Sequence, residues 1–353
     1  MMRGPEDVVH NARNGASLED VQAWMAEANV TDWLHLCEAA VFMGALDLVD
    51  GWSEHLTPAQ AAVLEMVRIR AAIGRLNEAV IEAALAVCSS QDTRDLALEG
   101  RVRMERGLFR FEQDDHEGAR DDLTWAETRL KSVAKASRDH DLAILNKGAF
   151  HLALGEQVMA LQVYGEMSRK EGHANESIAI SRLAAGRIYG DLGQMFDALR
   201  LLWISHAHAI LAGQRLLAIE AGTTFVDMAE VHLSDDAQPM QEQVESAGPR
   251  NIGDEAPMPG VLRSEAEEVL EWCAAACGDR VDGVERPDLR AVALLSARYG
   301  RLDIVAHLLG AQDGVEDPML CAVMQHVDEE GEEAWSRRMA QLTMHALDPQ
   351  TEV

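Results

Sequence analysis

Three arginines stand at helical spacing in the segment GRVRMERGLFRF. Arg103, Arg106 and Arg110 fall at positions i, i+3 and i+7, which places them on one face of a helix. The planar guanidinium group suits carboxylates and phosphates, so this face could bind an acidic peptide segment. The alternative is a solvated face on which the arginines pair with Glu99, Glu105 and neighbouring acids. We name the three arginines as candidate binding residues.

Other residue types capable of chemistry lack the partners that the chemistry needs. Cys273 and Cys277 stand four apart on one helical face, but a zinc site needs two more ligands, and no nearby His or Cys supplies them. We interpret both thiols as buried small residues. His206 and His208 stand two apart, so on a helix their side chains point about 200° apart and cannot chelate one ion. We therefore predict no metal site and no cofactor.

Two acidic clusters lie near predicted helix starts. Their members are Asp114, Asp115, Glu117, Asp121 and Asp122 in the first, and Asp328, Glu329, Glu330, Glu332 and Glu333 in the second. Carboxylates in a first turn are stabilised by unpaired N–H groups and the helix dipole, and neither cluster has the spacing of a calcium loop. The chain also lacks the sequence patterns of metalloproteases, nucleotide-binding loops and nucleophile elbows. We predict that it is not an enzyme and name no catalytic residue.

The composition predicts an all-helical protein. Ala, Leu, Val and Met dominate the apolar residues, whereas the 353-residue chain has only three Tyr, six Phe and nine Pro. The net charge of -29 disfavours DNA, RNA or an acidic membrane surface as a partner. Five cysteines without a framework spacing indicate reduced thiols. Residues 1–16 lack the apolar core of a signal peptide, and no run of 18 apolar residues occurs, so we expect a cytoplasmic protein.

A short pattern recurs along the chain and predicts helical hairpins. A turn glycine is followed by a small residue five positions later and by an apolar residue four further on. The copies are Gly74, Ala79 and Ala83; Gly155, Ala160 and Tyr164; and Gly193, Ala198 and Leu202, while the hairpin near residue 115 has Asp114, Ala119 and Leu123. Small residues also stand seven positions before the turn, as Gly107, Gly148 and Gly186. Glycine tolerates positive φ in the turn, and small residues let crossing helices approach closely.

This pattern resembles the tetratricopeptide (TPR) repeat family, with the best matches at residues 141–172 and 179–210. The family's Trp and Pro signposts are absent, and the hairpins are of irregular length. The resemblance implies an α-solenoid of stacked antiparallel helical hairpins whose concave surface binds a protein or peptide. Residues 289–309 resemble the two helices of a single ankyrin repeat, and the alternative there is an isolated hairpin that ends the solenoid.

The predicted helices are placed from capping residues, apolar periodicity and turn signals. They run 17–29, 31–43, 45–54, 57–72, 75–88, 92–112, 115–135, 138–154, 157–170, 175–191, 195–212, 214–233, 263–277, 287–299, 302–310, 316–327 and 330–346. We divide the chain into a flexible N-terminus (1–16), TPR-like repeats (17–233), a disordered acidic insertion (234–262), C-terminal hairpins that continue the solenoid (263–346) and a flexible tail (347–353). The insertion is assigned from its acidic, Pro- and Gly-rich composition.

These expectations favour a protein interaction scaffold or adaptor, with a peptide or protein bound on the concave helical surface. One alternative is a helical sensor or enzyme with a small-molecule site in the hollow of the solenoid. A second alternative is a structural subunit of a larger assembly. The sequence names no particular partner for any of the three.

Overall fold

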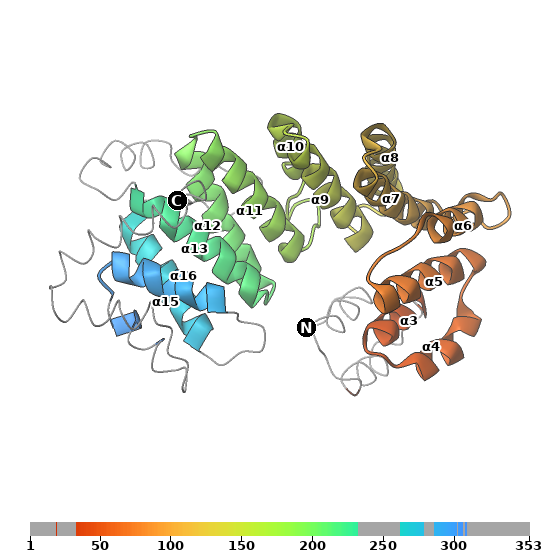
Figure 1. Cartoon of the computed structure of the whole chain (residues 1–353), viewed down its shortest axis with the longest axis horizontal. Coiled ribbons are helices and arrows are strands. Elements are labelled where there is room, and N and C mark those ends of the chain that lie inside the picture. The colour runs from red at the N-terminus through yellow and green to blue at the C-terminus, as the bar shows by residue number, and fades with distance from the viewer. Residues whose placement is uncertain are drawn as a thin grey trace, which may run out of the picture. The chain divides into compact units, whose positions relative to one another are not determined.

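In a computed structural model of the chain, every regular element among the described residues is a helix (Figure 1). The structure describes residues 19, 33–231, 262–278, 286–301, 303–305 and 308. The prediction of an all-α protein is confirmed for these residues. Several predicted segments lie outside them: 1–16, 234–261, 316–327, 330–346, 347–353 and most of the helices 17–29 and 302–310. Contacts divide the chain into two compact units, residues 1–166 and 167–353, which are described in turn.

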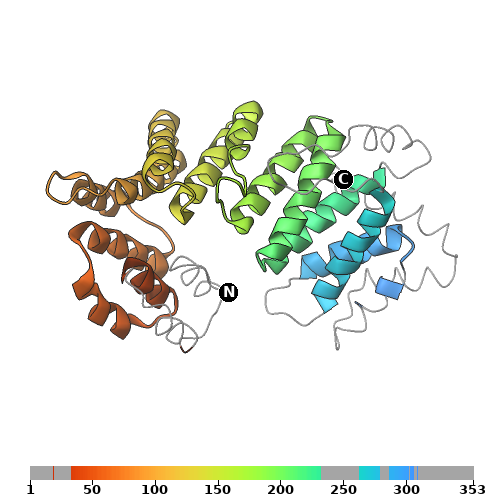
Figure 2. The same ribbon diagram turned by 180° about the vertical axis from the view of Figure 1, so that it is seen from behind.

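The first unit is a succession of antiparallel helix pairs. Its helices are α3 (Trp33–Phe42), α4 (Leu46–Trp52), a short 3-10 helix η1 (Ser53–His55), α5 (Pro58–Ile73), α6 (Glu78–Ser89), α7 (Leu96–Glu112), α8 (His116–Val133), α9 (Arg138–Ala153) and α10 (Gln157–Tyr164). The pairs α5–α6, α7–α8 and α9–α10 each pack together, as views from the two sides show (Figures 1 and 2). The first helices of successive pairs, α3, α5, α7 and α9, also contact one another in that order.

Capping and turn residues set the ends of these helices where the sequence predicts them. Thr57 and Gln60 form a capping box at the start of α5, with Pro58 in the first turn. Gly74 and Gly155 adopt the left-handed conformation, with φ of 81° and 74°. Asp114 takes the same conformation at φ 62°, so this turn is built like the glycine turns although its residue carries a side chain.

Three helix boundaries differ from the prediction because of local chemistry. α6 begins at Glu78 instead of residue 75, since the Asn77 side chain accepts a hydrogen bond from the N–H of Val80. α7 begins at Leu96 instead of residue 92, because Asp95 caps it. α10 ends at Tyr164 instead of residue 170, directly before Gly165, and glycine is unfavourable in a helix interior.

The recurring small residues explain how close the two helices of a hairpin come. A Cβ atom on Gly107 of α7 would lie 2.9 Å from Cγ of Leu123 on α8, and one on Gly148 of α9 would collide with the ring of Tyr164 on α10. The apolar residue of the pattern thus rests on the glycine of the preceding helix. The hairpin geometry is fixed by this contact, as the spacing predicts.

The second unit continues with α11 (Asn175–Asp191), α12 (Met195–Leu211), α13 (Arg215–Val231), α15 (Leu262–Gly278) and α16 (Arg286–Arg298). Gly186 of α11 lies against Leu202 of α12, with a distance of 2.8 Å from a hypothetical Cβ to Cγ. α13 packs against α15 across the undescribed residues 232–261, and both contact α16. A continuous apolar cluster around Phe225 and Leu270 joins these helices. Within the described residues, no helix combines the length and the apolar character needed to cross a membrane.

Candidate functional site

Helix α7 of the first unit places the three candidate arginines on one face, and that face is turned toward α8. Arg106 donates two hydrogen bonds to the carboxylate of Asp122, from Nε at 2.7 Å and from Nη2 at 2.8 Å. Nη1 of Arg110 donates to the same carboxylate at 2.8 Å. Nη1 of Arg103 reaches Asp122 at 3.4 Å. The Asp122 side chain is only 2% exposed, so three guanidinium groups enclose one buried carboxylate.

The outer donors of this arginine group are also engaged. Arg106 donates from Nη1 to Glu82 of α6 at 3.0 Å, and Arg103 donates from Nε to Glu99 at 3.2 Å. The guanidinium group of Arg103 lies 4.2 Å from the centre of the Trp125 ring, which is a cation–π contact. The pKa of Arg106 is raised, chiefly by its hydrogen bonds to Asp122. We call this set of residues the Asp122 cluster; whether its arginines bind a partner stays a prediction.

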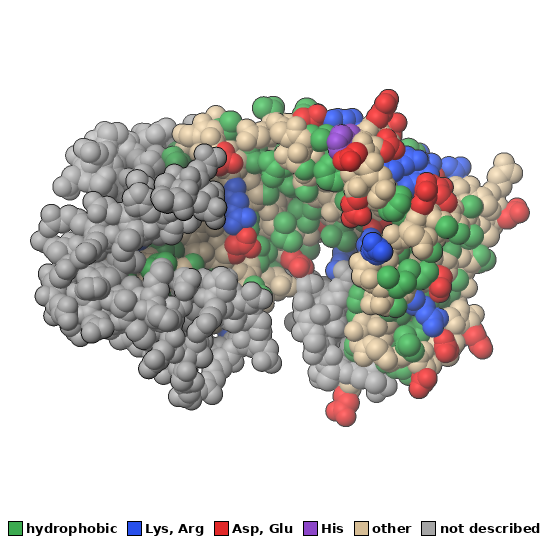
Figure 3. Space-filling view, in the orientation of Figure 1, with side chains coloured by type: hydrophobic (Ala, Val, Ile, Leu, Met, Phe, Trp, Pro, Cys, Tyr) green, Lys and Arg blue, Asp and Glu red, His purple; other side chains and the backbone are tan. Residues whose placement is uncertain are grey.

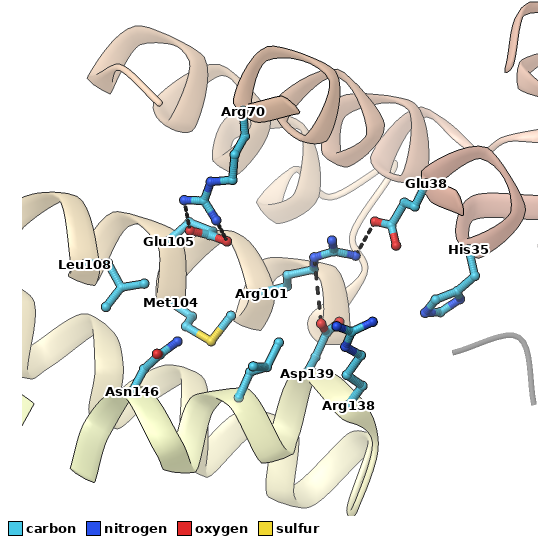
Figure 4. Close-up of a pocket in the computed structure, with 11 residues that line it drawn as sticks. His35, Glu38, Arg70, Arg101, Met104, Glu105, Leu108, Arg138, Asp139 and Asn146 are labelled. Atoms are coloured by element: carbon cyan, nitrogen blue, oxygen red, sulfur yellow. Dashed lines mark hydrogen bonds and ion pairs between the residues drawn. The ribbon is translucent and has the colours of Figure 1, made fainter. Parts of the chain in front are cut away.

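The opposite side of α7 faces a pocket of about 230 Å³ (Figure 4). Its lining residues in the described part of the chain all come from the first helices of the four helix pairs. They are His35 and Glu38 on α3, Arg70 on α5, Arg101, Met104, Glu105 and Leu108 on α7, and Arg138, Asp139, Leu142 and Asn146 on α9. None of the residues on α4, α6, α8 or α10 contributes. The pocket is therefore formed by the first helices of the pairs, and the second helices do not line it.

Arg101 is the central residue of the pocket. Its side chain is 11% exposed, and Nη1 lies 2.6 Å from Glu38 of α3, while Nε lies 3.7 Å from Asp139 of α9. Burial by itself lowers the pKa of this guanidinium group, but Glu38, Asp139 and Glu105 more than offset that effect, so the pKa is raised. Arg101 is therefore a permanent, nearly buried cation that ties three helices together.

A second ion pair lies beside it. Arg70 of α5 binds Glu105 of α7 with both terminal nitrogens, at 2.6 and 2.5 Å. The Arg70 side chain is 43% exposed, whereas Glu105 is 11% exposed, so the arginine covers its partner at the solvent side. In Figure 4, Glu38, Asp139 and Arg138 lie toward one end of the pocket, Leu108 and Asn146 lie toward the other, and the Arg70–Glu105 pair lies between them. The pocket thus combines a charged end with an apolar and amide end.

The charges of the pocket balance locally. Three arginines, Arg70, Arg101 and Arg138, stand against three carboxylates, Glu38, Glu105 and Asp139. The wider surface of the first unit also carries both signs of charge, since Figure 3 shows basic and acidic side chains next to one another on the face turned to the viewer. Such a site offers hydrogen-bond donors and acceptors without a strong net field.

The remaining sequence candidates of the first unit have structural contacts. Asp115 caps α8 by accepting a hydrogen bond from the N–H of Gly118, as expected for a carboxylate at a helix start. Asp122, from the same acidic cluster, instead pairs with the arginines of α7. The second predicted acidic cluster, residues 328–333, lies outside the described residues.

The candidates of the second unit are buried in its packing. Cys273 and Cys277 lie in the apolar cluster. The pKa of Cys273 is raised, chiefly by burial and to a smaller extent by the nearby thiol of Cys277. Nδ1 of His206 is 2.8 Å from the carbonyl oxygen of Ala218, and Nδ1 of His208 is 3.0 Å from Oδ1 of Asn175. Burial lowers the pKa of both histidines, and Arg169 and Arg182 add to the effect at His208, which titrates at about 4.

Sequence reasoning did not find the pocket, although a signal for it exists. Arg101 and Leu142 both lie 13 residues before the turn residue of their hairpin, and Glu105 and Asn146 both lie nine before it. Aligning the hairpins on Asp114 and Gly155 therefore brings pocket-lining residues into register. Glu38 and Arg70 give no such signal, because their contacts to α7 are made across hairpins.

Comparison with known proteins adds no assignment: no family model, curated protein or solved structure matches the chain. The candidate site is thus defined by its own geometry.

Proposed function

We propose that the protein is an interaction scaffold or adaptor that binds an extended segment of another protein, and that the pocket along α3, α5, α7 and α9 is the central subsite. The observation that carries this proposal is that every described residue lining the pocket lies on the first helix of one of four successive helix pairs. A surface built in this way runs across the helices and suits an extended chain laid over them.

The dimensions and chemistry of the pocket support a peptide ligand. A volume of about 230 Å³ holds a single large side chain, and the surface that continues along the first helices can contact the residues on either side. Four helices converge on the pocket through ion pairs, so its walls are held in place before a ligand arrives. We further propose that the hairpins within each unit stack as TPR-like repeats do, in keeping with the recurring glycine and alanine spacing.

The test is a peptide-display selection on the full chain, followed by binding measurements with two matched variants of α9. Asn146→Phe fills the pocket with a ring. Leu152→Phe places the same ring on the same helix at a residue that is 37% exposed and does not line the pocket. We expect Asn146→Phe to weaken the selected peptides at least tenfold and Leu152→Phe to leave them unchanged.

Two results would contradict the proposal. One is a selection that returns no peptide, and the other is a set of selected peptides that bind both variants as well as they bind the original chain. Circular dichroism of both variants confirms that any loss reflects the pocket and not the fold.

A further inference from the structure

One nitrogen of Arg101 forms no hydrogen bond or ion pair with the described residues. Nη1 is taken by Glu38 and Nε faces Asp139, but within the described part of the chain no hydrogen bond is formed by Nη2 (Figure 4). The side chain is 11% exposed and lines the pocket, and Nη2 is not among the buried atoms that lack a hydrogen bond, so a ligand in the pocket can reach this donor. Water can occupy an accessible donor of this kind in the free protein, and a ligand acceptor can take the place of that water.

The surrounding charges decide what kind of acceptor fits. Arg101 already stands among Glu38, Asp139 and Glu105, so a ligand carboxylate would meet three like charges. A cationic ligand would meet Arg70, Arg101 and Arg138 instead. The balance of three positive and three negative groups therefore disfavours a charged group of either sign and favours a neutral ligand with a strong acceptor.

We infer that the pocket takes an uncharged carboxamide, the side chain of a glutamine or asparagine in the bound segment, through the juxtaposition of the unpartnered Nη2 of Arg101 with the carboxylate of Asp139. The carboxamide oxygen accepts from Nη2, and its NH₂ group donates to Asp139, whose side chain is 22% exposed. Met104, Leu108 and Leu142 offer an apolar wall to the methylene groups. This inference rests on the proposed function and names the chemistry of its partner.

The probe is a set of five peptide pools. Each pool contains acetylated and amidated nonapeptides with randomised flanks and one fixed central residue, which is Gln, Asn, Glu, Lys or Leu. Immobilised full-length protein, the Asn146→Phe variant and the Leu152→Phe variant are each exposed to every pool, and the retained peptide is measured.

We expect the Gln and Asn pools to be retained at least fivefold more than the other three, with retention lost in Asn146→Phe only. The carboxamide inference is overturned if the Glu, Lys or Leu pool is retained as well as the Gln and Asn pools and this retention is lost in Asn146→Phe. The proposed function would then still stand. If no pool depends on Asn146, the proposed function fails, and the inference fails with it.

Arg101→Lys tests the named donor directly. Lysine keeps the positive charge between Glu38 and Asp139 but cannot present Nη2. We expect a folded protein that binds Gln peptides at least tenfold more weakly, while Arg120→Lys, at the exposed ion pair with Glu156, has no effect. Unchanged binding by Arg101→Lys would overturn the inference. Because the ligand is neutral, we also expect the Gln-pool affinity to change less than twofold between 50 and 500 mM NaCl, and a steep salt dependence would contradict it.

Discussion

The two sides of α7 carry arginine networks of opposite construction. In the Asp122 cluster, one buried carboxylate is enclosed by Arg103, Arg106 and Arg110. In the pocket, one nearly buried arginine, Arg101, is enclosed by carboxylates. Both arrangements compensate charge, but they differ in hydrogen bonding, since Arg106 uses all three of its nitrogens and Arg101 leaves Nη2 open.

The difference shows that charge balance alone does not mark a site. A guanidinium group has five N–H donors. One carboxylate neutralises its charge but accepts hydrogen bonds from only some of these donors. Saturated donors indicate an arginine that holds the fold together. Open donors on a buried arginine beside a cavity indicate a place for a ligand. Four predictions test whether this division between the two sides of α7 is correct.

The largest effect is expected from Asp122→Asn. The substitution keeps the shape of the side chain but leaves three arginines without their shared carboxylate, and breaking a buried ion pair typically costs about 3–5 kcal/mol. The free energy of unfolding from urea titration measures the loss. The neighbouring Asp121→Asn, at an exposed position of the same helix, serves as the control and should change little. A loss under about 1 kcal/mol would mean that the Asp122 cluster does not hold the fold.

Gly107→Ala tests the close approach of α7 and α8 that buries Asp122. The new methyl group meets Leu123, so we expect a loss of about 1–2 kcal/mol despite the better helix propensity of alanine. In a Leu123→Ala background the clash is relieved, and the same substitution should be neutral or stabilising. Additive effects in this double-mutant cycle would show that the contact does not set the spacing.

A pair of Arg→Lys substitutions compares the two sides directly. Arg106→Lys removes a paired contact to Asp122 and should lower the free energy of unfolding by about 1–2 kcal/mol without affecting peptide binding. Arg101→Lys keeps the positive charge beside Glu38 and Asp139, so its free energy of unfolding should change little, whereas its peptide binding should be lost. The same ranking of the two variants in both assays would refute the division of roles.

The smallest effect is expected at the solvent side of the pocket. Arg70→Ala removes an ion pair whose arginine is 43% exposed, and such pairs contribute up to about 1 kcal/mol. Thermal unfolding compared with Arg187→Ala, at another exposed pair, gives the scale. A loss well above 2 kcal/mol would show that the pocket side of α7 is as important to the fold as the Asp122 cluster.

The helical hairpins were predictable because their determinants are local. The turn residue before the second helix, the alanine five residues later and the small residue in the first helix lie within one hairpin of sequence. The shared face of Arg103, Arg106 and Arg110 follows from helical spacing in the same way. Their partner could not be predicted in the same way. Asp122 belongs to the next helix, and its position beside the arginines depends on how α7 and α8 cross.

The pocket could not be read from the sequence as a whole. Its central contact joins Glu38 and Arg101, which stand 63 residues apart on helices of different hairpins. Helical periodicity predicts which residues share a face of one helix, but it does not fix how successive hairpins rotate against each other. That rotation decides which of the many charged residues in this acidic chain meet.

The pocket's dependence on four hairpins has a consequence for how the molecule can change during evolution. Each hairpin is defined by its own turn and by the packing of its own two helices, so duplication or loss of one hairpin leaves the architecture of the others intact. The pocket has no such independence, because His35, Arg70, Arg101 and Asn146 come from four different hairpins. Insertion of a single hairpin between α4 and α9 would preserve the array and erase the recognition site.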